Sequence, residues 1–149
     1  MNPAIDLLLN RHSTPAKQLA APAPEGEHLE LILRAAMSAP DHRALRPWRF
    51  LLVRDEARAR LGDLLAEGFQ RRHPEADADT IERQREKPLR SPLLILLVAH
   101  IQECAKVPEW EQMMAVGAAA EHMQLMAQAL GYGSVWLSGE HCGDVRVEK

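Results

Sequence analysis

Aromatic residues and cysteines are both scarce in this 149-residue chain: aromatics make up 4% of it, and the two cysteines are Cys104 and Cys142. Two cysteines cannot build the disulfide framework of a small secreted protein, which favours a reducing, intracellular compartment. A core with few aromatics must consist mainly of Leu, Ala, Val, Ile and Met. The hydrophobic fraction of 46% and the charged fraction of 26% are typical of a globular domain. They exclude a collagenous or wholly disordered chain.

The chain also lacks a strong charge of either sign and a long apolar run. A net charge of -3 argues against a protein built around nucleic-acid phosphates. The longest apolar run, residues 93–99, is far shorter than the roughly 20 residues of a membrane helix. The N-terminus has no basic region ahead of an apolar run, so no targeting signal is expected. We therefore expect one cytoplasmic domain with neither a membrane nor a nucleic-acid partner.

Apolar spacing and turn residues divide the chain into helices and strands. Asn2 and Pro3 are typical of a helix start, and this first helix should end before Pro15. Asp55 is expected to cap the helix that follows it. The polar segment 73–91, with charges of both signs, is typical of a solvated helix or a mobile flap. The other predicted helices span about 25–38, 55–72 and 109–130, and the predicted strands span 48–54, 92–99 and 133–137. This order predicts a layered fold with a sheet and substantial helix.

The helix at 109–130 is the clearest prediction. It carries few charges after Glu111, so most of its circumference must be covered by other parts of a protein. Gly117 and the three alanines after it are small enough for close helix contact. Gly131 suits the end of this helix. Gly131 and Gly133 do not form a dinucleotide fingerprint, because that motif needs a strand before it and a helix after it.

No arrangement of the seven histidines and two cysteines has the spacing of a zinc site, so no metal is expected. Cys104 could act as a nucleophile only if folding brought a distant histidine to it.

Two segments offer groups for a ligand. Arg11, His12 and Ser13 follow the first helix and supply a guanidinium, an imidazole and a hydroxyl, which suit a phosphate. The alternative is that Arg11 and His12 only complement the negative end of that helix. Residues 39–48 form a proline-bracketed loop that could hold His42 against a flat ligand. The alternative for this loop is an ordinary connection that places Trp48 in the core.

Five segments are informative when they are taken together and in order: Asn10-Arg11-His12-Ser13, Ala39-Pro40-Asp41-His42, Arg46-Pro47-Trp48-Arg49-Phe50, residues 106–112 and residues 131–139. None of them is specific alone. In this order they resemble the FMN-dependent nitroreductase family, and in particular its small bacterial NAD(P)H nitroreductase subgroup. The resemblance covers residues 6–139.

The resemblance implies an α+β fold, with a nitroreductase-like mixed sheet flanked by helices, in an intertwined homodimer that holds one FMN at each end of its interface. The long helix would form the core of that dimer. The implied cofactor contacts are Arg11, His12 and Ser13 at the phosphate and ribityl side, Ser38 and His42 from the other subunit, Trp136, Leu137 and Ser138 over the flavin ring, and Met126, Ala127, Gln128, Ala129, Leu130 and Gly131 at the nicotinamide cofactor.

The implied chemistry is that of the cofactor. FMN would take hydride from NADH or NADPH and pass electrons in turn to a nitroaromatic, a quinone or a similar acceptor. No catalytic side chain is implied, and Arg46 and Lys17 are candidates for a positive group near the ring.

The sequence departs from the family in two places. Arg46 stands where most relatives carry Gln. Relatives also continue for some tens of residues after the segment at 136–139, whereas residues 140–149 match none of that continuation. One alternative is therefore a flavin-binding relative without turnover, and another is a helical dimerisation module without a ligand.

Overall fold

The computed structural model describes residues 2–143 of the chain, so the expected departure from the family beyond residue 143 lies outside it. Helices alternate with two strands. The helices are α1 (Pro3–Leu9), α2 (Gly26–Met37), α3 (Glu56–Arg72), α4 (Ala78–Arg85) and α5 (Glu109–Ala129), the strands are β1 (Trp48–Arg54) and β2 (Leu93–Ala99), and the short 3-10 helices are η1 (Ala16–Gln18), η2 (His42–Ala44), η3 (Lys87–Arg90) and η4 (Glu140–Gly143). The predicted helices and the first two predicted strands are confirmed, and so is the α+β class. None of the helices in residues 2–143 has the length and hydropathy of a membrane span.

Several boundaries follow from local chemistry that the sequence already indicates. The Asn2 side chain accepts a hydrogen bond from the Ala4 amide at 2.9 Å, and Pro3 takes the first position of α1. At the other end of the chain, α5 ends beside Gly131, whose φ of +85° is costly for any residue with a β-carbon.

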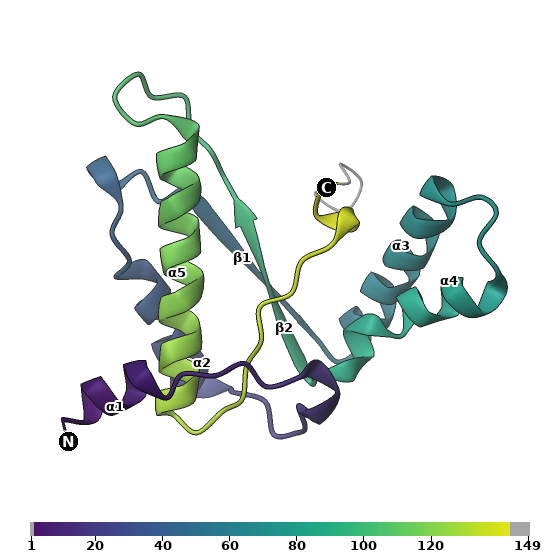
Figure 1. The fold of residues 1–149 in the computed structure, drawn as a ribbon, viewed down its shortest axis with the longest axis horizontal. Coiled ribbons are helices and arrows are strands. Elements are labelled where there is room, and N and C mark those ends of the chain that lie inside the picture. Colours follow the sequence, from purple (N-terminus) through teal and green to yellow (C-terminus); the bar gives the residue numbers. More distant parts are fainter. Residues whose placement is uncertain (1, 144–149) are drawn as a thin grey trace.

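The two strands form an antiparallel pair whose faces pack on different helices. Trp48 lies opposite Ala99 and Arg54 lies opposite Leu93. Side chains alternate between the faces of a strand, so Trp48 and Phe50 join the core beside α2 and α5, whereas Val53 packs with α3. Figure 1 shows these two helical groups at opposite ends of the strand pair. This two-sided packing explains why β2 is apolar along its whole length.

The main core lies where α2 and α5 meet the strands. Ala36 of α2 and Ala119 of α5 are fully inaccessible to solvent, and such small side chains let the two helices approach closely. Trp48 packs in the same core, which agrees with the interpretation of residues 39–48 as a connection that places Trp48 in the core. The other buried members of this core are Ile32, Ala39, Ala115, Val116, Met123 and Ala127.

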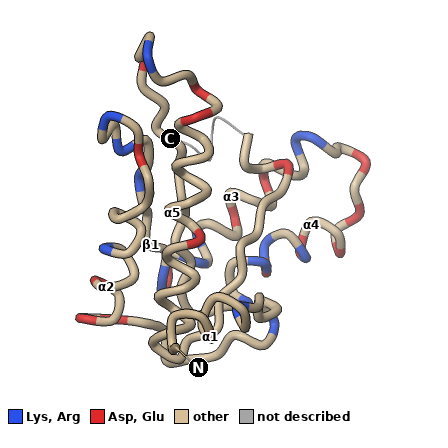
Figure 2. The backbone as a smooth tube through the Cα atoms, turned by 60° about the vertical axis from the view of Figure 1, so that its left-hand side comes forward, with Lys and Arg blue, Asp and Glu red and all other residues tan. Residues whose placement is uncertain are grey.

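The polar segment 73–91 contains a helix rather than an unstructured flap. Helix α4 lies along α3, and the Arg85 guanidinium bonds the carboxylates of Asp63 and Glu82. Charges of both signs are frequent along α3 and α4, whereas α5 has few between its first turn and Glu121 (Figure 2). The alternating charges therefore reflect a solvated helical arm.

Four expectations are wrong. Residues 133–137 form no strand, because the described chain gives them one ladder-type bond, from the Thr14 amide to the Ser134 carbonyl, and no neighbouring strand. The sheet of residues 2–143 is thus a single antiparallel pair rather than a mixed sheet. Strand β2 is half-buried instead of buried, since it has one neighbouring strand. Asp55 takes the N-cap position of α3 with a φ of +51°, outside the extended region typical of N-caps, and its side chain makes no capping hydrogen bond.

Gln112 is the one buried polar side chain in the described core, with 2% of its surface exposed. Its Oε1 accepts a hydrogen bond from the Gln102 amide at 2.9 Å, and its Nε2 donates to the carbonyls of Gln102 (2.8 Å) and Val107 (3.0 Å). The side chain therefore satisfies the backbone of the loop that leads from β2 into α5.

Replacing Gln112 by Ala should leave these backbone groups without partners and lower the free energy of unfolding by roughly 3 kcal/mol. Urea denaturation of the purified protein measures this change. Lys106→Ala, in the same loop but exposed, should change stability by less than about 0.5 kcal/mol. Equal effects of the two substitutions would contradict a structural role for the Gln112 amide.

Candidate functional site

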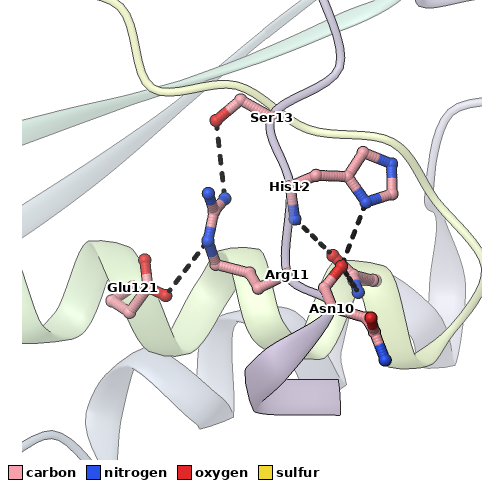
Figure 3. A network of polar contacts seen from close by, with 6 residues as sticks. Asn10, Arg11, His12, Ser13 and Glu121 are labelled. Carbon is pink, nitrogen blue, oxygen red and sulfur yellow. Dashed lines mark hydrogen bonds and ion pairs between the residues drawn. The ribbon is translucent and has the colours of Figure 1, made fainter. Parts of the chain in front are cut away.

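The turn after α1 gathers a guanidinium and a hydroxyl on one side of the chain. Arg11 Nη1 lies 3.4 Å from Ser13 Oγ, and Arg11 Nε lies 3.6 Å from Glu121 Oε1 on α5. The Arg11 side chain is 27% exposed. Figure 3 shows Arg11 and Ser13 on one side of the backbone and the His12 ring on the other. Of the three predicted phosphate contacts, Arg11 and Ser13 are thus neighbours, and the His12 ring points away from them.

The same turn is bonded to the last part of α5. Gln128 Oε1 accepts a hydrogen bond from the His12 amide at 3.2 Å, and Gln128 Nε2 donates to the Asn10 carbonyl at 3.1 Å. His12 Nδ1 also lies 3.1 Å from the Asn10 oxygen. A carbonyl can only accept, so Nδ1 is the protonated ring nitrogen and Nε2 is the one left to face solvent.

The segment after α5 passes beside this turn. The Thr14 amide donates to the Ser134 carbonyl at 2.9 Å. A β-carbon placed on Gly133 would lie 2.8 Å from Thr14 Oγ1, too close unless a neighbour moves, and 3.0 Å from Leu19 Cδ2, which is tighter than most contacts of real β-carbons. A residue without a side chain at position 133 therefore lets the two segments meet.

Trp136, Leu137 and Ser138, which the resemblance assigns to the flavin ring, continue from this contact along α5. A β-carbon on Gly117 would lie 3.8 Å from the Trp136 ring, so the indole rests over that glycine. Nevertheless, 57% of the Trp136 surface and 69% of the Leu137 surface are exposed, and Ser138 is exposed as well. The segment thus presents a large apolar surface to solvent beside α5.

Ser38, at the end of α2, contacts α5 through His122. Ser38 Oγ donates to the Ala35 carbonyl at 2.8 Å and lies 3.1 Å from His122 Nδ1, which is also 3.1 Å from the Ala35 oxygen. A shallow, mostly apolar cavity of about 250 Å³ opens here between α1, α2 and α5. It is lined by Leu7, Ala35, Ser38, His122, Leu125, Met126 and Ala129.

His42 lies at the opposite end of α5. Its Nδ1 is 2.8 Å from Glu111 Oε1 in the first turn of that helix. The loop around it is held tightly, since the Asp41 carboxylate accepts a hydrogen bond from the Arg46 amide at 2.6 Å. Arg43, Ala44 and Arg46 all have positive φ values, which other contacts of the loop must hold in place. The loop is therefore constrained, as its two prolines predict.

The predicted nicotinamide segment, residues 126–131, is the last turn and cap of α5. The amides of Leu130, Gly131 and Tyr132 all donate to carbonyls within this cap. Ala127 is buried and Gln128 holds the turn at residues 10–12, so Met126 and Ala129 are left to line the cavity. No basic residue lies in this turn, where the helix end is negative.

Glu140, near the end of the described residues, binds His73 and Arg72 at the end of α3. His73 Nε2 donates to Glu140 Oε2 at 3.0 Å, and this hydrogen bond, with help from Arg72, lowers the pKa of Glu140. Burial lowers the pKa of His141, and the nearby positive charges of Lys87 and Arg72 lower it further. Residues 136–138 are therefore held at one end by the contact on α5 and at the other by α3.

Helix α5 contacts most of the predicted site residues, but one chain does not bring them all together. Arg11 and His42 are bonded to Glu121 and Glu111, which are about 15 Å apart along the helix at 1.5 Å per residue. Sequence reasoning missed Glu111, Glu121 and His122 as partners of site residues. The sequence did contain a signal for them, because polar side chains on a helix that is mostly apolar need hydrogen-bond or ion-pair partners when they are buried.

Comparison with known proteins decides the family. The family model described as "Nitroreductase family" matches residues 8–147. The chain belongs to the nitroreductase family. It is 45% identical over 136 residues to "Putative NAD(P)H nitroreductase YdjA" of Escherichia coli strain K12, an alignment that covers 91% of this chain and 72% of that protein. A similarly named protein of Haemophilus influenzae is 41% identical over 140 residues, covering 92% of this chain and 73% of that one.

Solved structures agree with this assignment to the nitroreductase family. A nitroreductase-like family protein from Bacillus cereus superposes with a TM-score of 0.76 at 25% identity, over 91% of this chain and 69% of its own. A protein from Desulfovibrio desulfuricans, crystallised in complex with FMN, superposes with a TM-score of 0.66 at 27% identity, over 93% and 69% of the two chains. The recognition made from five short segments is thus confirmed.

In this nitroreductase-family chain, Gly133→Ala should push Thr14 away and disturb the neighbouring turn at residues 11–13. We expect a loss of about 1 kcal/mol in the free energy of unfolding. The double variant Gly133→Ala/Thr14→Ala removes the closest contact and should recover most of that loss, which a double-mutant cycle in urea measures. Strictly additive losses would show that the approach of Gly133 to Thr14 is not the constraint.

Proposed function

We propose that this chain is an FMN-dependent NAD(P)H oxidoreductase of the nitroreductase type. The observation that carries the proposal is the turn after α1, where Arg11 and Ser13 lie together beside α5. They offer hydrogen-bond donors suited to a phosphate, in a chain of this family. Two lines of support come from relatives: the names of the Escherichia coli and Haemophilus influenzae proteins, and the FMN in the Desulfovibrio desulfuricans structure.

The residues at the turn fit the phosphate of FMN. The two terminal nitrogens of a guanidinium carry four donor hydrogens, and Arg11 uses one of them for Ser13, so three are left for an anion while the Nε edge forms an ion pair with Glu121. The Ser13 hydroxyl lies beside them, and its side chain is exposed. Because Glu121 meets the Nε edge, the terminal nitrogens stay directed toward Ser13. The His12 ring, on the other side of the backbone, is assigned to the ribityl side.

The other cofactor contacts are proposed to come from a second copy of the chain. Ser38 and His42 lie on the α2 side of α5, and His42 is far along the helix from Arg11, so a complete site needs another subunit. An apolar surface suited to association lies on the first half of α5, where Trp110 is 63% exposed and Met114 is 67% exposed. This surface also explains why the sequence of α5 is apolar nearly all round although one chain covers only part of it.

In the proposed reaction bound FMN would supply the redox chemistry, which is the transfer of hydride from NADH or NADPH and of electrons to a nitroaromatic, a quinone or a similar acceptor. Arg11 and Ser13 hold the phosphate by charge-assisted hydrogen bonds. Trp136, Leu137 and Ser138 cover the ring and exclude water from it. Met126 and Ala129 would meet the nicotinamide cofactor through apolar side chains, since the amides of residues 130–132 are already bonded within the helix cap. The protein contributes position rather than a catalytic acid or base.

The test is an absorption spectrum of the protein reconstituted with FMN, followed by addition of NADH or NADPH without oxygen. We expect a yellow protein whose blue absorption bleaches. Arg11→Ala should weaken FMN binding about a hundredfold, because it removes charged hydrogen bonds worth about 2 to 3 kcal/mol. Arg34→Ala, an exposed cation of α2, is the matched control and should bind FMN as the unmodified protein does.

Two outcomes would contradict the proposal in different ways. A yellow protein that does not bleach with either nicotinamide would be a flavin-binding relative without turnover. A protein that binds no FMN, and whose oligomeric state and stability are indifferent to Arg11→Ala, would be a dimerisation module instead.

A further inference from the structure

Gln128 makes an unusual connection for a residue in the last turn of a helix. Its amide group bonds the backbone on both sides of Arg11, a residue 117 positions earlier: the carbonyl of Asn10 before it and the amide of His12 after it. The direction of the amide is unambiguous, because the His12 N–H can only donate and the Asn10 oxygen can only accept. The two backbone groups that Gln128 bonds belong to Asn10 and His12, which Figure 3 shows on either side of Arg11 in the turn.

The geometry of a peptide chain makes this contact a constraint on Arg11. The peptide groups before and after a residue are planar, and the φ and ψ angles of that residue are the only soft backbone angles between them. Gln128 holds both peptide groups that flank Arg11. It therefore fixes φ and ψ of Arg11, and with them the direction in which the arginine side chain leaves the backbone.

That direction decides whether Arg11 and Ser13 meet one anion. In an extended chain, residues i and i+2 point to the same side and residue i+1 points to the other. The turn has this arrangement, with Arg11 and Ser13 together and the His12 ring opposite. Glu121, seven residues before Gln128 and so on the same face of α5, takes the Nε edge of the guanidinium. The backbone and the side chain of Arg11 are thus both fixed by α5.

We propose that Gln128 is a positioning residue for the phosphate of FMN, and not a contact of the nicotinamide cofactor. The inference rests on the proposed function, since it takes Arg11 and Ser13 as the phosphate site. It assigns a long-range role to a residue whose place in the sequence suggested a different ligand. Its amide accepts from the His12 amide and donates to the Asn10 carbonyl, so the turn at residues 10–12 sets the orientation of the side chain.

The test compares FMN with riboflavin, which lacks the phosphate, by quenching of flavin fluorescence. In Gln128→Met the side chain keeps its length and loses both hydrogen bonds. We expect its affinity for FMN to fall about tenfold and its affinity for riboflavin to change less than twofold. A merely structural loss would lower both affinities equally. Gln124→Met is the matched control, since the side-chain oxygen of Gln124 on the same helix has no hydrogen-bond partner among residues 2–143, and it should keep the preference of the unmodified protein for FMN.

Hydrogen exchange of the unliganded protein tests the contact without any flavin. The His12 amide should exchange faster in Gln128→Met than in the unmodified protein, and at the unmodified rate in Gln124→Met. Gln128→Glu provides a second variant if the first folds poorly. It retains an acceptor for the His12 amide but loses the donor to Asn10, so the fall in FMN preference should be smaller.

The outcomes separate the inference from the proposed function. If the unmodified protein prefers FMN and Gln128→Met keeps the same preference, the inference is overturned and the proposed function stands. If Gln128→Met instead raises the KM for NADH or NADPH with FMN affinity unchanged, Gln128 belongs to the nicotinamide site. If the unmodified protein does not distinguish FMN from riboflavin, the phosphate site is wrong and both proposals fail.

Discussion

The packing of α5 against α2 and one face of the strand pair is the constraint on which the rest of the structure depends. Small side chains such as Ala36 and Ala119 let the helices meet closely, and Trp48 fills the space below. Once this contact is made, the rotation of α5 about its axis is fixed. Several of its polar side chains then have fixed directions, and Glu111, His122 and Gln128 meet segments distant in the sequence.

This arrangement explains how a chain with few aromatic and polar core residues can build a site. Gln112 holds the loop before α5, Glu111 meets His42, His122 meets Ser38, and Gln128 holds the turn beside Arg11. These contacts lie along one helix, so the candidate site is spread along it rather than gathered in one pocket. In the proposed function, a second copy of α5 and its attached loops brings the separated halves together.

The parts of the fold that the sequence predicts depend on near neighbours. The start of α1 at Asn2 and Pro3, and its end near the turn, follow from side-chain and ring chemistry within a few residues. The end of α5 at Gly131 does so as well. The family was recognisable because five short segments occur in order, although no one of them is decisive. Arg11 and Ser13 could be named as a phosphate site for the same local reason.

The parts that the sequence does not predict depend on distant partners. Residues 133–137 have the composition of a strand, but no neighbouring strand is present to pair with them in residues 2–143. Gln128 could be recognised as a polar residue that needs a partner, yet its partners lie 116 and 118 residues away. Asp55 has the residue type of a helix cap, but its side chain makes no capping hydrogen bond, and its φ of +51° could not be predicted from its residue type.

The claim that two copies of α5 complete one flavin site is tested most directly by sedimentation velocity of the FMN-loaded protein. The absorbance of the flavin and that of the protein are recorded in the same run. The account predicts that the flavin sediments with a particle of two chains, at one FMN per chain, and that none sediments with a single chain. Flavin bound to a single sedimenting chain would contradict it.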